Sequence, residues 1–253
     1  MECKASVLQK LHDGDSHMSC RFKWVSCQFD FLRRYPPERI QLALKELPDT
    51  LDGTYERSLR DIDEAIWDYA HRLFQCMAVA SRPFYVEELA EFLAFDFEVG
   101  QIPKLVEDRR RRDPIQAVLT TCSSLITVVR EDEDEDEDED GWSSSNDLKL
   151  VQFSHFSVKE FLMSGRLAAA HMPTIRRYNI LTRPAHTMVA KACLGTLLHL
   201  DEKITNDSLK NLPLARYAAS HWVGHALFED VSVTVQEGMK CLFDPRTDRK
   251  SVV

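Results

Sequence analysis

Two short apolar runs, LITVVRE and LKLVQFSH, flank a tract of ten consecutive acidic residues at positions 131–140. Both runs are rich in β-branched and large apolar residues, and this composition predicts two strands. Ten like charges without an apolar neighbour cannot be buried, so the acidic tract is expected to form a solvated loop between the strands. A minority interpretation is that the tract docks a basic partner.

Two helices are expected before these strands, one over residues 86–95 and one in the stretch DPIQAVLTTCSS, where Pro114 suits the first turn. The resulting order is helix, helix, strand, loop, strand. This order is typical of a winged helix, with the acidic tract inside the wing. The predicted fold class is therefore mainly α, a winged helix domain with a small antiparallel β wing, flanked by helical segments.

The flanking segments carry helical periodicity. One stripe of apolar residues at helical spacing predicts a long amphipathic helix. Its members are Leu59, Ile62, Ile66, Tyr69, Leu73, Phe74 and Met77. Further helices are predicted in RPAHTMVAKACLGTLLHL and PLARYAASHWVGHALF.

The stretch LVQFSHFSVKEFL begins like a strand and ends like a helix, with His155 at the joint. Ser157 and Glu160 have the spacing of a capping box, in which the serine caps the helix and the glutamate bonds back to it. The sequence therefore predicts a helix that begins at Ser157. His155 in the preceding turn is either held structurally by backbone carbonyls or faces outward as a donor to a phosphate.

Composition and charge exclude several classes of protein. The net charge of -9 comes from the acidic tract, and the rest of the 253 residues is close to neutral, so no global field attracts nucleic acid or an anionic membrane. The seven cysteines are scattered without a CxxC spacing, which favours reduced thiols. The sequence contains neither a signal peptide nor an apolar run long enough to cross a membrane. We expect a soluble, cytoplasmic protein.

The motifs of common enzymes are absent from the sequence. It contains no GK[ST] phosphate-binding loop, no GxSxG and no HExxH, so no catalytic residue is assigned and the chain is not expected to be an enzyme. His221 and His225 stand one helical turn apart, but without a third ligand they indicate surface or interface histidines rather than a metal site. Cys20 and Cys27, near two histidines, match no zinc template. No metal is predicted.

One basic cluster, RRRR at residues 109–112, raises the question of DNA binding. A winged helix often meets DNA through its second helix, but DPIQAVLTTCSS carries a single charge. The wing that would face the phosphates carries ten carboxylates instead. Nucleic acid is therefore not the expected partner, and the arginines are predicted to pair with the acidic loop or to remain solvated.

Several stretches together resemble one family. RFKWVSCQFDFLRR, ALKELPDTLDGTYERSL, SRPFYVEELAEFLAFD, LVQFSHFSVKEFL and PLARYAASHWVGHA are similar to the region that follows the nucleotide-binding core of NACHT-type signal-transduction (STAND) ATPases. The branch in question carries the GPI inositol-deacylase winged helix domain and usually continues into ankyrin repeats. The resemblance covers residues 21–243, and its specific parts are LP-x-TL-x-x-x-Y and F-x-H-x-S-x-x-E-F-L.

The resemblance implies roles for particular residues. His155 would approach a nucleotide phosphate, with Ser157 and Glu160 fixing its turn. The hinge between lid and winged helix would lie at Leu47, Pro48, Thr50 and Leu51. ADP or ATP is implied only if the missing ATPase core is supplied, and this chain alone has no cofactor. Gly53 replaces the family's glutamate, which removes half of a capping box and favours a looser helix start.

The expected organisation has four parts: a disordered tail (1–20), a helical remnant of the lid (21–68), the winged helix (69–165, with its acidic loop at 131–147) and a helical domain (166–253). The expected function is a non-enzymatic regulatory and packing module of a NACHT-type switch protein, with the ATPase core and repeat domains as partners. Two alternatives stay open, namely a DNA-binding winged helix and a stand-alone adaptor that uses the acidic loop.

Overall fold

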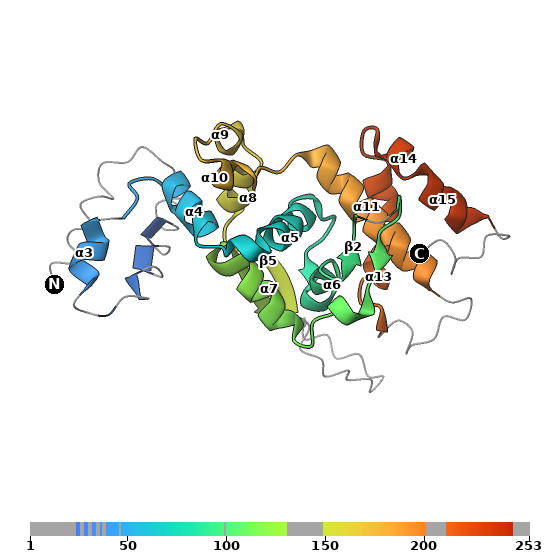
Figure 1. Ribbon diagram of the computed structural model, residues 1–253, viewed down its shortest axis with the longest axis horizontal. Coiled ribbons are helices and arrows are strands. Elements are labelled where there is room, and N and C mark those ends of the chain that lie inside the picture. The colour runs from blue at the N-terminus through green and yellow to red at the C-terminus, as the bar shows by residue number, and fades with distance from the viewer. Residues whose placement is uncertain are drawn as a thin grey trace, which may run out of the picture. The chain divides into compact units, whose positions relative to one another are not determined.

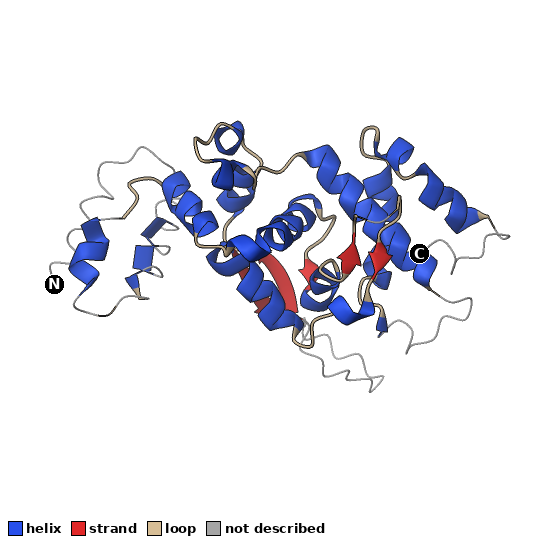
Figure 2. Ribbon diagram, in the orientation of Figure 1, coloured by secondary structure: helices blue, strands red, loops and turns tan. Residues whose placement is uncertain are grey.

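The computed structural model describes residues 24–25, 28–29, 32–33, 36, 39–45, 47–98, 100–130, 149–200 and 211–244. The predicted tail at 1–20 and the acidic loop at 131–147 lie outside the described residues. The described part is mainly helical and contains a small antiparallel sheet (Figures 1 and 2). The chain forms two compact units. The first consists of residues 1–63, 123–125 and 154–179, and the second of residues 64–122, 126–153 and 180–253.

The first unit is helical. Its elements are α3 (Ile40–Lys45), α4 (Leu51–Arg60), η4 (Ser123–Leu125), α8 (Phe156–Leu162), α9 (Gly165–Ala168) and α10 (Pro173–Arg176). Tyr55 and Leu59 on α4 are 1% exposed, and the Tyr55 ring packs against Phe161 of α8 with centroids 5.5 Å apart. An ion pair of 2.6 Å between Arg166 and Asp52 joins α9 to the first turn of α4. The unit is therefore organised around the buried face of α4.

The long helix predicted from the apolar stripe is wrong in one respect, because the structure divides it in two. Helix α4 ends at Arg60, where the backbone N–H of Asp61 still bonds the carbonyl of Arg57 but the helix does not continue. The second helix, α5 (Trp67–Val79), follows the short turn η2 (Glu64–Ile66). Helix α4 belongs to the first unit and α5 to the second, and each buries apolar residues of the stripe. The regular spacing of these residues therefore continues across the break between the two helices.

The second unit holds the sheets and the longest helices. Besides α5 it contains β1 (Phe84–Tyr85), α6 (Val86–Glu91), β2 (Phe95–Asp96), β3 (Lys104–Leu105), η3 (Glu107–Arg109), α7 (Pro114–Cys122), β4 (Ile126–Arg130), β5 (Lys149–Phe153), α11 (Thr182–His199), α13 (Ala215–Ala226), α14 (Val231–Thr234) and α15 (Gln236–Phe243). The predicted order of helix, helix, strand and strand is present as α6, α7, β4 and β5. Helix α6 is shorter than the predicted range of 86–95 and ends at Glu91.

The main sheet is antiparallel, with the strand order β1-β5-β4. Strands β4 and β5 pair from Ile126 opposite Phe153 to Arg130 opposite Lys149, so they form the two arms predicted on either side of the acidic tract. The early strand β1 adds to the far side of β5, where Phe84 faces Val151. A strand from before the two helices thus completes the sheet.

Helix α11 joins the C-terminal helices to the rest of the second unit. It packs against α5 on one side and against α13 and α15 on the other (Figure 1). Its residues Ala190 and Leu194 belong to a core cluster with Ala226, Val231 and Val235. Residues 180–244 therefore share one compact unit with the strands, whereas the prediction placed residues 166–253 in a separate domain. The segment 154–165, assigned to the winged helix, belongs to the first unit.

None of the described helices combines the length and the apolar character that crossing a bilayer requires.

Candidate functional site

The candidate site is the turn at the start of α8, in the first unit. His155 is the N-cap of this helix, with the extended backbone angles φ -163° and ψ 150°, and its Nδ1 accepts a hydrogen bond of 3.3 Å from the backbone N–H of Ser157. The helix therefore begins one residue earlier than the capping box predicted. Ser157 is the second residue of α8 rather than its cap, so the reciprocal pair of Ser157 and Glu160 is not formed.

The Ser157 hydroxyl has two hydrogen-bond partners. The Oγ of Ser157 lies 2.8 Å from the phenolic oxygen of Tyr55 and 2.6 Å from Nδ1 of His155. Both Tyr55 and Ser157 are buried. The Ser157 hydroxyl faces these two partners, and the imidazole of His155 caps the helix by accepting from the N–H of Ser157.

These contacts fix the position of the imidazole proton. A backbone N–H can only donate, so Nδ1 of His155 is an acceptor and the neutral ring carries its proton on Nε2. The Ser157 hydroxyl then donates to Nδ1, and the Tyr55 hydroxyl donates to Ser157. The result is a directed chain of hydrogen bonds from Tyr55 to His155, in which the ring carries its proton on Nε2.

The segment predicted as a hinge forms the start of α4. Thr50 is the N-cap of that helix, and its Oγ1 accepts a bond of 3.0 Å from the N–H of Gly53. Leu47 is buried, and the carbonyl of Pro48 accepts a bond of 3.0 Å from the indole N–H of Trp24. Leu51 is the first residue of the helix. The helix start thus keeps its cap although glycine replaces glutamate at position 53.

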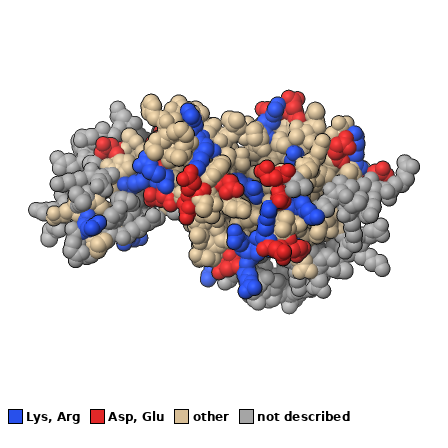
Figure 3. Space-filling view, viewed as in Figure 1, with Lys and Arg blue, Asp and Glu red and all other residues tan. Residues whose placement is uncertain are grey.

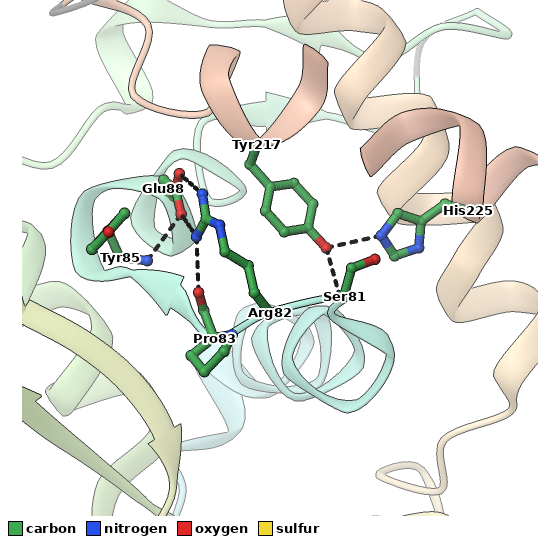
Figure 4. Close-up of polar contacts among 7 residues, drawn as sticks. All are labelled: Ser81, Arg82, Pro83, Tyr85, Glu88, Tyr217 and His225. Carbon is green, nitrogen blue, oxygen red and sulfur yellow. Dashed lines mark hydrogen bonds and ion pairs between the residues drawn. The ribbon is translucent and has the colours of Figure 1, made fainter. Parts of the chain in front are cut away.

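A second polar cluster lies in the second unit (Figure 4). The hydroxyl of Tyr217 on α13 accepts a bond of 3.1 Å from the N–H of Ser81 and lies 2.9 Å from Nε2 of His225. The Nδ1 of His225 in turn lies 2.9 Å from Nδ1 of His186 on α11. Tyr217 is fully buried, His225 is 1% exposed and His186 is half-buried, so the chain runs from the core towards the surface.

Burial decides the ionisation of this cluster. Removal from water, together with the nearby His186 and His221, lowers the pKa of His225 to about 4. Desolvation raises the pKa of Tyr217 to about 12, against the hydrogen bond from Ser81, which lowers it. Both groups are therefore neutral at ordinary pH. The prediction of a surface or interface position is wrong for His225, which is a buried, hydrogen-bonded residue.

The ion pair of Arg82 and Glu88 lies beside that cluster (Figure 4). Its two oxygen–nitrogen contacts measure 2.6 and 2.8 Å, and Glu88 also accepts a bond of 2.9 Å from the N–H of Tyr85 at the start of α6. The hydrogen bond to Glu88 raises the pKa of Arg82 more than burial lowers it. The Arg82 guanidinium also lies over the rings of Tyr85 and Tyr217. This pair anchors α6 against α13.

The arginine cluster at residues 109–112 pairs within the second unit. Arg110 bonds Glu91 of α6, with an Nε to Oε1 distance of 3.1 Å, and Arg109 bonds Asp96 at 3.0 Å. Burial raises the pKa of Glu91 more than Arg110 lowers it. The sequence predicted that these arginines pair with the acidic loop or remain solvated. In the structure, Arg109 and Arg110 instead pair with carboxylates of the second unit. In the view of Figure 3, acidic and basic side chains are intermixed.

The described residues contain no group of three or more histidine, cysteine or acidic side chains placed to hold a metal ion. The ring of His221 packs against Tyr217 in a tilted arrangement, with centroids 4.7 Å apart, while His225 bonds the same residue through its ring nitrogen. Sequence reasoning did not single out Tyr55, Tyr217 or His186. For Tyr55 a signal existed, because it is the tyrosine of the LP-x-TL-x-x-x-Y stretch.

The chain is similar to a known protein. The chain is 30% identical over 215 residues to the azaphilone pigments biosynthesis cluster protein L of Monascus ruber. The match covers 83% of this chain and 42% of that protein, so the chain spans less than half of its relative's length. No family model matches the chain. No solved structure matches it either.

Proposed function

We propose that this chain is a non-enzymatic regulatory and packing module of a NACHT-type switch protein. The observation that carries the proposal is the hydrogen-bonded chain of Tyr55, Ser157 and His155. Tyr55 ends one of the two specific motif stretches of the resemblance, and His155 and Ser157 belong to the other. Two stretches that are far apart in the sequence thus meet in one buried contact.

The chemistry of that contact suits a sensor of an anionic group. An imidazole whose Nδ1 is occupied donates through Nε2, and phosphate oxygens accept such bonds strongly. In this proposal His155 donates a hydrogen bond to a phosphate of ADP or ATP that a separate ATPase core holds. A change at His155 then reaches α4 through Ser157 and Tyr55.

DNA binding is the weaker candidate. Helix α7 carries no charged residue, and its exposed positions are Gln116, Leu119 and Thr120, of which Gln116 and Thr120 bond each other at 2.8 Å. Such a face offers phosphates no cation. Of the four arginines that precede the helix, Arg109 and Arg110 are already paired with carboxylates. The winged-helix order of elements is therefore proposed to serve protein packing.

The relative's name places it in a pigment biosynthesis cluster, and its greater length leaves room for further domains. We infer that the module works in the cytoplasm within a longer protein, with an ATPase core and repeat domains as its partners. Regulation of such a cluster, rather than a biosynthetic step, is the contribution we assign to it.

The test joins this chain to the nucleotide-binding core of a NACHT-type ATPase. The measured quantity is the rate at which bound ADP is released. We expect His155→Ala to accelerate release, and Lys159→Ala, an exposed change on the same helix, to leave it unchanged. The isolated chain should neither hydrolyse ATP nor shift duplex DNA in a gel. Unchanged release in His155→Ala, or DNA binding that weakens steeply with salt and requires residues 109–112, would refute the proposal.

A further inference from the structure

A pocket of about 500 Å³ opens on the second unit, away from Tyr217 and His225. Its walls come from α5, from the loop between β2 and β3, from α11 and from α14. This volume lies within the range of small-molecule sites. The residues that matter for its chemistry are Trp67, Asp68, Arg72, Phe97, Arg183 and Lys191.

The charge of the pocket is positive. Three permanent cations line it against one carboxylate, Asp68, which is exposed at the start of α5. Arg183 is paired loosely with Asp230 at 3.6 Å, and both side chains are largely exposed, so that pair neutralises little of the charge. An anion that entered the pocket would therefore gain electrostatic energy.

Arg72 is held in place without being neutralised. Its Nη1 donates to the carbonyl oxygens of Phe92 and Phe95, at 3.3 and 3.2 Å, and its guanidinium carbon lies 4.6 Å from the centre of the Phe97 ring. These partners are dipoles and a ring, and none is a carboxylate. A guanidinium fixed in this way is a preorganised anion partner.

Lys191 supplies a second cation on the facing wall, on α11. Its side chain is half-buried, and within the described part of the chain its ammonium group has no hydrogen bond or ion pair. An ammonium group on the wall of the pocket can donate to an anion that enters it. Arg72 and Lys191 are therefore the two cations that a ligand would engage.

The walls also offer flat apolar surface. The Trp67 indole stacks on the ring of His71 with an interplanar angle of 25°, and the ring of Phe97 lines the same pocket. Both aromatic side chains are half-buried. Aromatic faces of this kind bind flat rings through burial and stacking.

Two glycines shape the described part of the loop that carries Phe97 and its contact with α11. Gly100 adopts φ +72°, a conformation that favours glycine. Farther along, the backbone of Pro103 lies against Gly195 of α11, where a Cβ would come within 2.9 Å of the Pro103 carbonyl oxygen. Pro103 is thus held close to α11 by a contact that only glycine permits.

We propose that this pocket binds a small aromatic carboxylic acid, with its carboxylate on Arg72 and Lys191 and its ring against Trp67 and Phe97. The inference is independent of His155 and of nucleotide sensing, because every residue it uses lies in the second unit. Binding of such a ligand would allow a small molecule to regulate the module.

The test titrates the full chain with 2-naphthoate and, separately, with neutral 2-naphthamide, by calorimetry. One site is expected for the carboxylate, with the amide binding about tenfold more weakly. Lys191→Met should weaken 2-naphthoate by about tenfold and leave the amide unchanged. Phe97→Ala should weaken both probes. The matched control, Lys159→Met on α8, should change neither.

Three results would overturn the proposal: no binding of 2-naphthoate, equal binding of acid and amide, or binding of the acid that survives Lys191→Met. Circular dichroism of each variant, compared with the wild-type spectrum, separates loss of the site from loss of the fold. Binding that tracks Lys191 and Phe97 together supports the assignment.

Discussion

The hydroxyl of Tyr55 lies 2.8 Å from the Oγ of Ser157, although the two residues are 102 positions apart in the chain. Both residues are buried, and the Ser157 hydroxyl also forms a hydrogen bond with Nδ1 of His155. A contact between two helices, α4 and α8, therefore decides how a single imidazole is oriented. The first prediction concerns this contact.

Removal of the tyrosine hydroxyl should destabilise the protein modestly. Tyr55→Phe loses one buried hydrogen bond, and we expect a fall in the free energy of unfolding of about 1 kcal/mol. Urea denaturation measures it. Because the two groups form one chain, the double variant with Ser157→Ala should lose less than the sum of the single losses. Tyr69→Phe, at a half-buried position on α5, is the control and should cost under about 0.5 kcal/mol. Strict additivity of the pair would contradict the contact.

Stability should depend on pH through His225. Its pKa is lowered from 6.5 to about 4 in the folded chain, so between these values the unfolded chain binds a proton that the folded chain does not. The stabilisation is complete above pH 6.5 and is lost as the pH falls towards 4. Linkage sets its size at roughly 3 kcal/mol.

Urea denaturation at several pH values checks this dependence. His225→Gln should flatten the slope between pH 6.5 and pH 4, whereas His171→Gln, at an exposed position, should leave it unchanged. His186, His221 and Tyr217 surround His225 and remain in both variants. An unchanged slope in His225→Gln would show that other groups cause the dependence.

Two glycines should respond to alanine with opposite signs. At Gly195 a Cβ would lie 2.9 Å from the carbonyl oxygen of Pro103, so Gly195→Ala forces the backbone apart and should cost about 1–3 kcal/mol. At Gly224, on the exposed side of α13, a Cβ meets nothing within 4 Å. Gly224→Ala should therefore stabilise the protein by up to about 1 kcal/mol. Thermal melts of the two variants measure the difference, and equal signs would argue against the close packing of α11.

Loss of Glu88 should be among the most damaging single changes in the second unit. Glu88→Ala leaves Arg82 half-buried without its carboxylate and removes the bond to the N–H of Tyr85. The Arg82 side chain is 32% exposed and can be hydrated, so the lost charge-assisted hydrogen bonds should cost about 1.5–3 kcal/mol. Glu87→Ala, one residue earlier and exposed, should cost under about 0.5 kcal/mol. Chemical denaturation of the two variants distinguishes them, and similar losses would show that the pair is not structural.

The sequence predicts the secondary structure of the second unit well where periodicity is long or β-branched residues cluster. The helices in RPAHTMVAKACLGTLLHL and PLARYAASHWVGHALF are α11 and α13, and LITVVRE and LKLVQFSH pair as β4 and β5. The break between α4 and α5 was missed because the apolar stripe continues through residues 61–63 with helical spacing. The periodicity of apolar residues predicts which side chains are buried. It does not predict which of the two units buries them.

The candidate site was located by sequence but its geometry was not. His155 was expected at the turn before a helix, and it lies there. Its role as the cap was not predicted, because the Ser157 hydroxyl bonds the remote Tyr55 and His155, and the imidazole caps the helix by accepting from the N–H of Ser157. The cluster of Tyr217, His225 and His186 joins two helices, and nothing local to any of the three residues indicates it.

The orientation of the His155 ring is the central claim, and long-range proton–nitrogen NMR correlation of the imidazoles tests it most directly. The structure predicts a neutral His155 with its proton on Nε2 and with Nδ1 as an acceptor, and a loss of this preference in Tyr55→Phe combined with Ser157→Ala. A proton on Nδ1, or a tautomer mixture that the double variant leaves unchanged, would contradict the account.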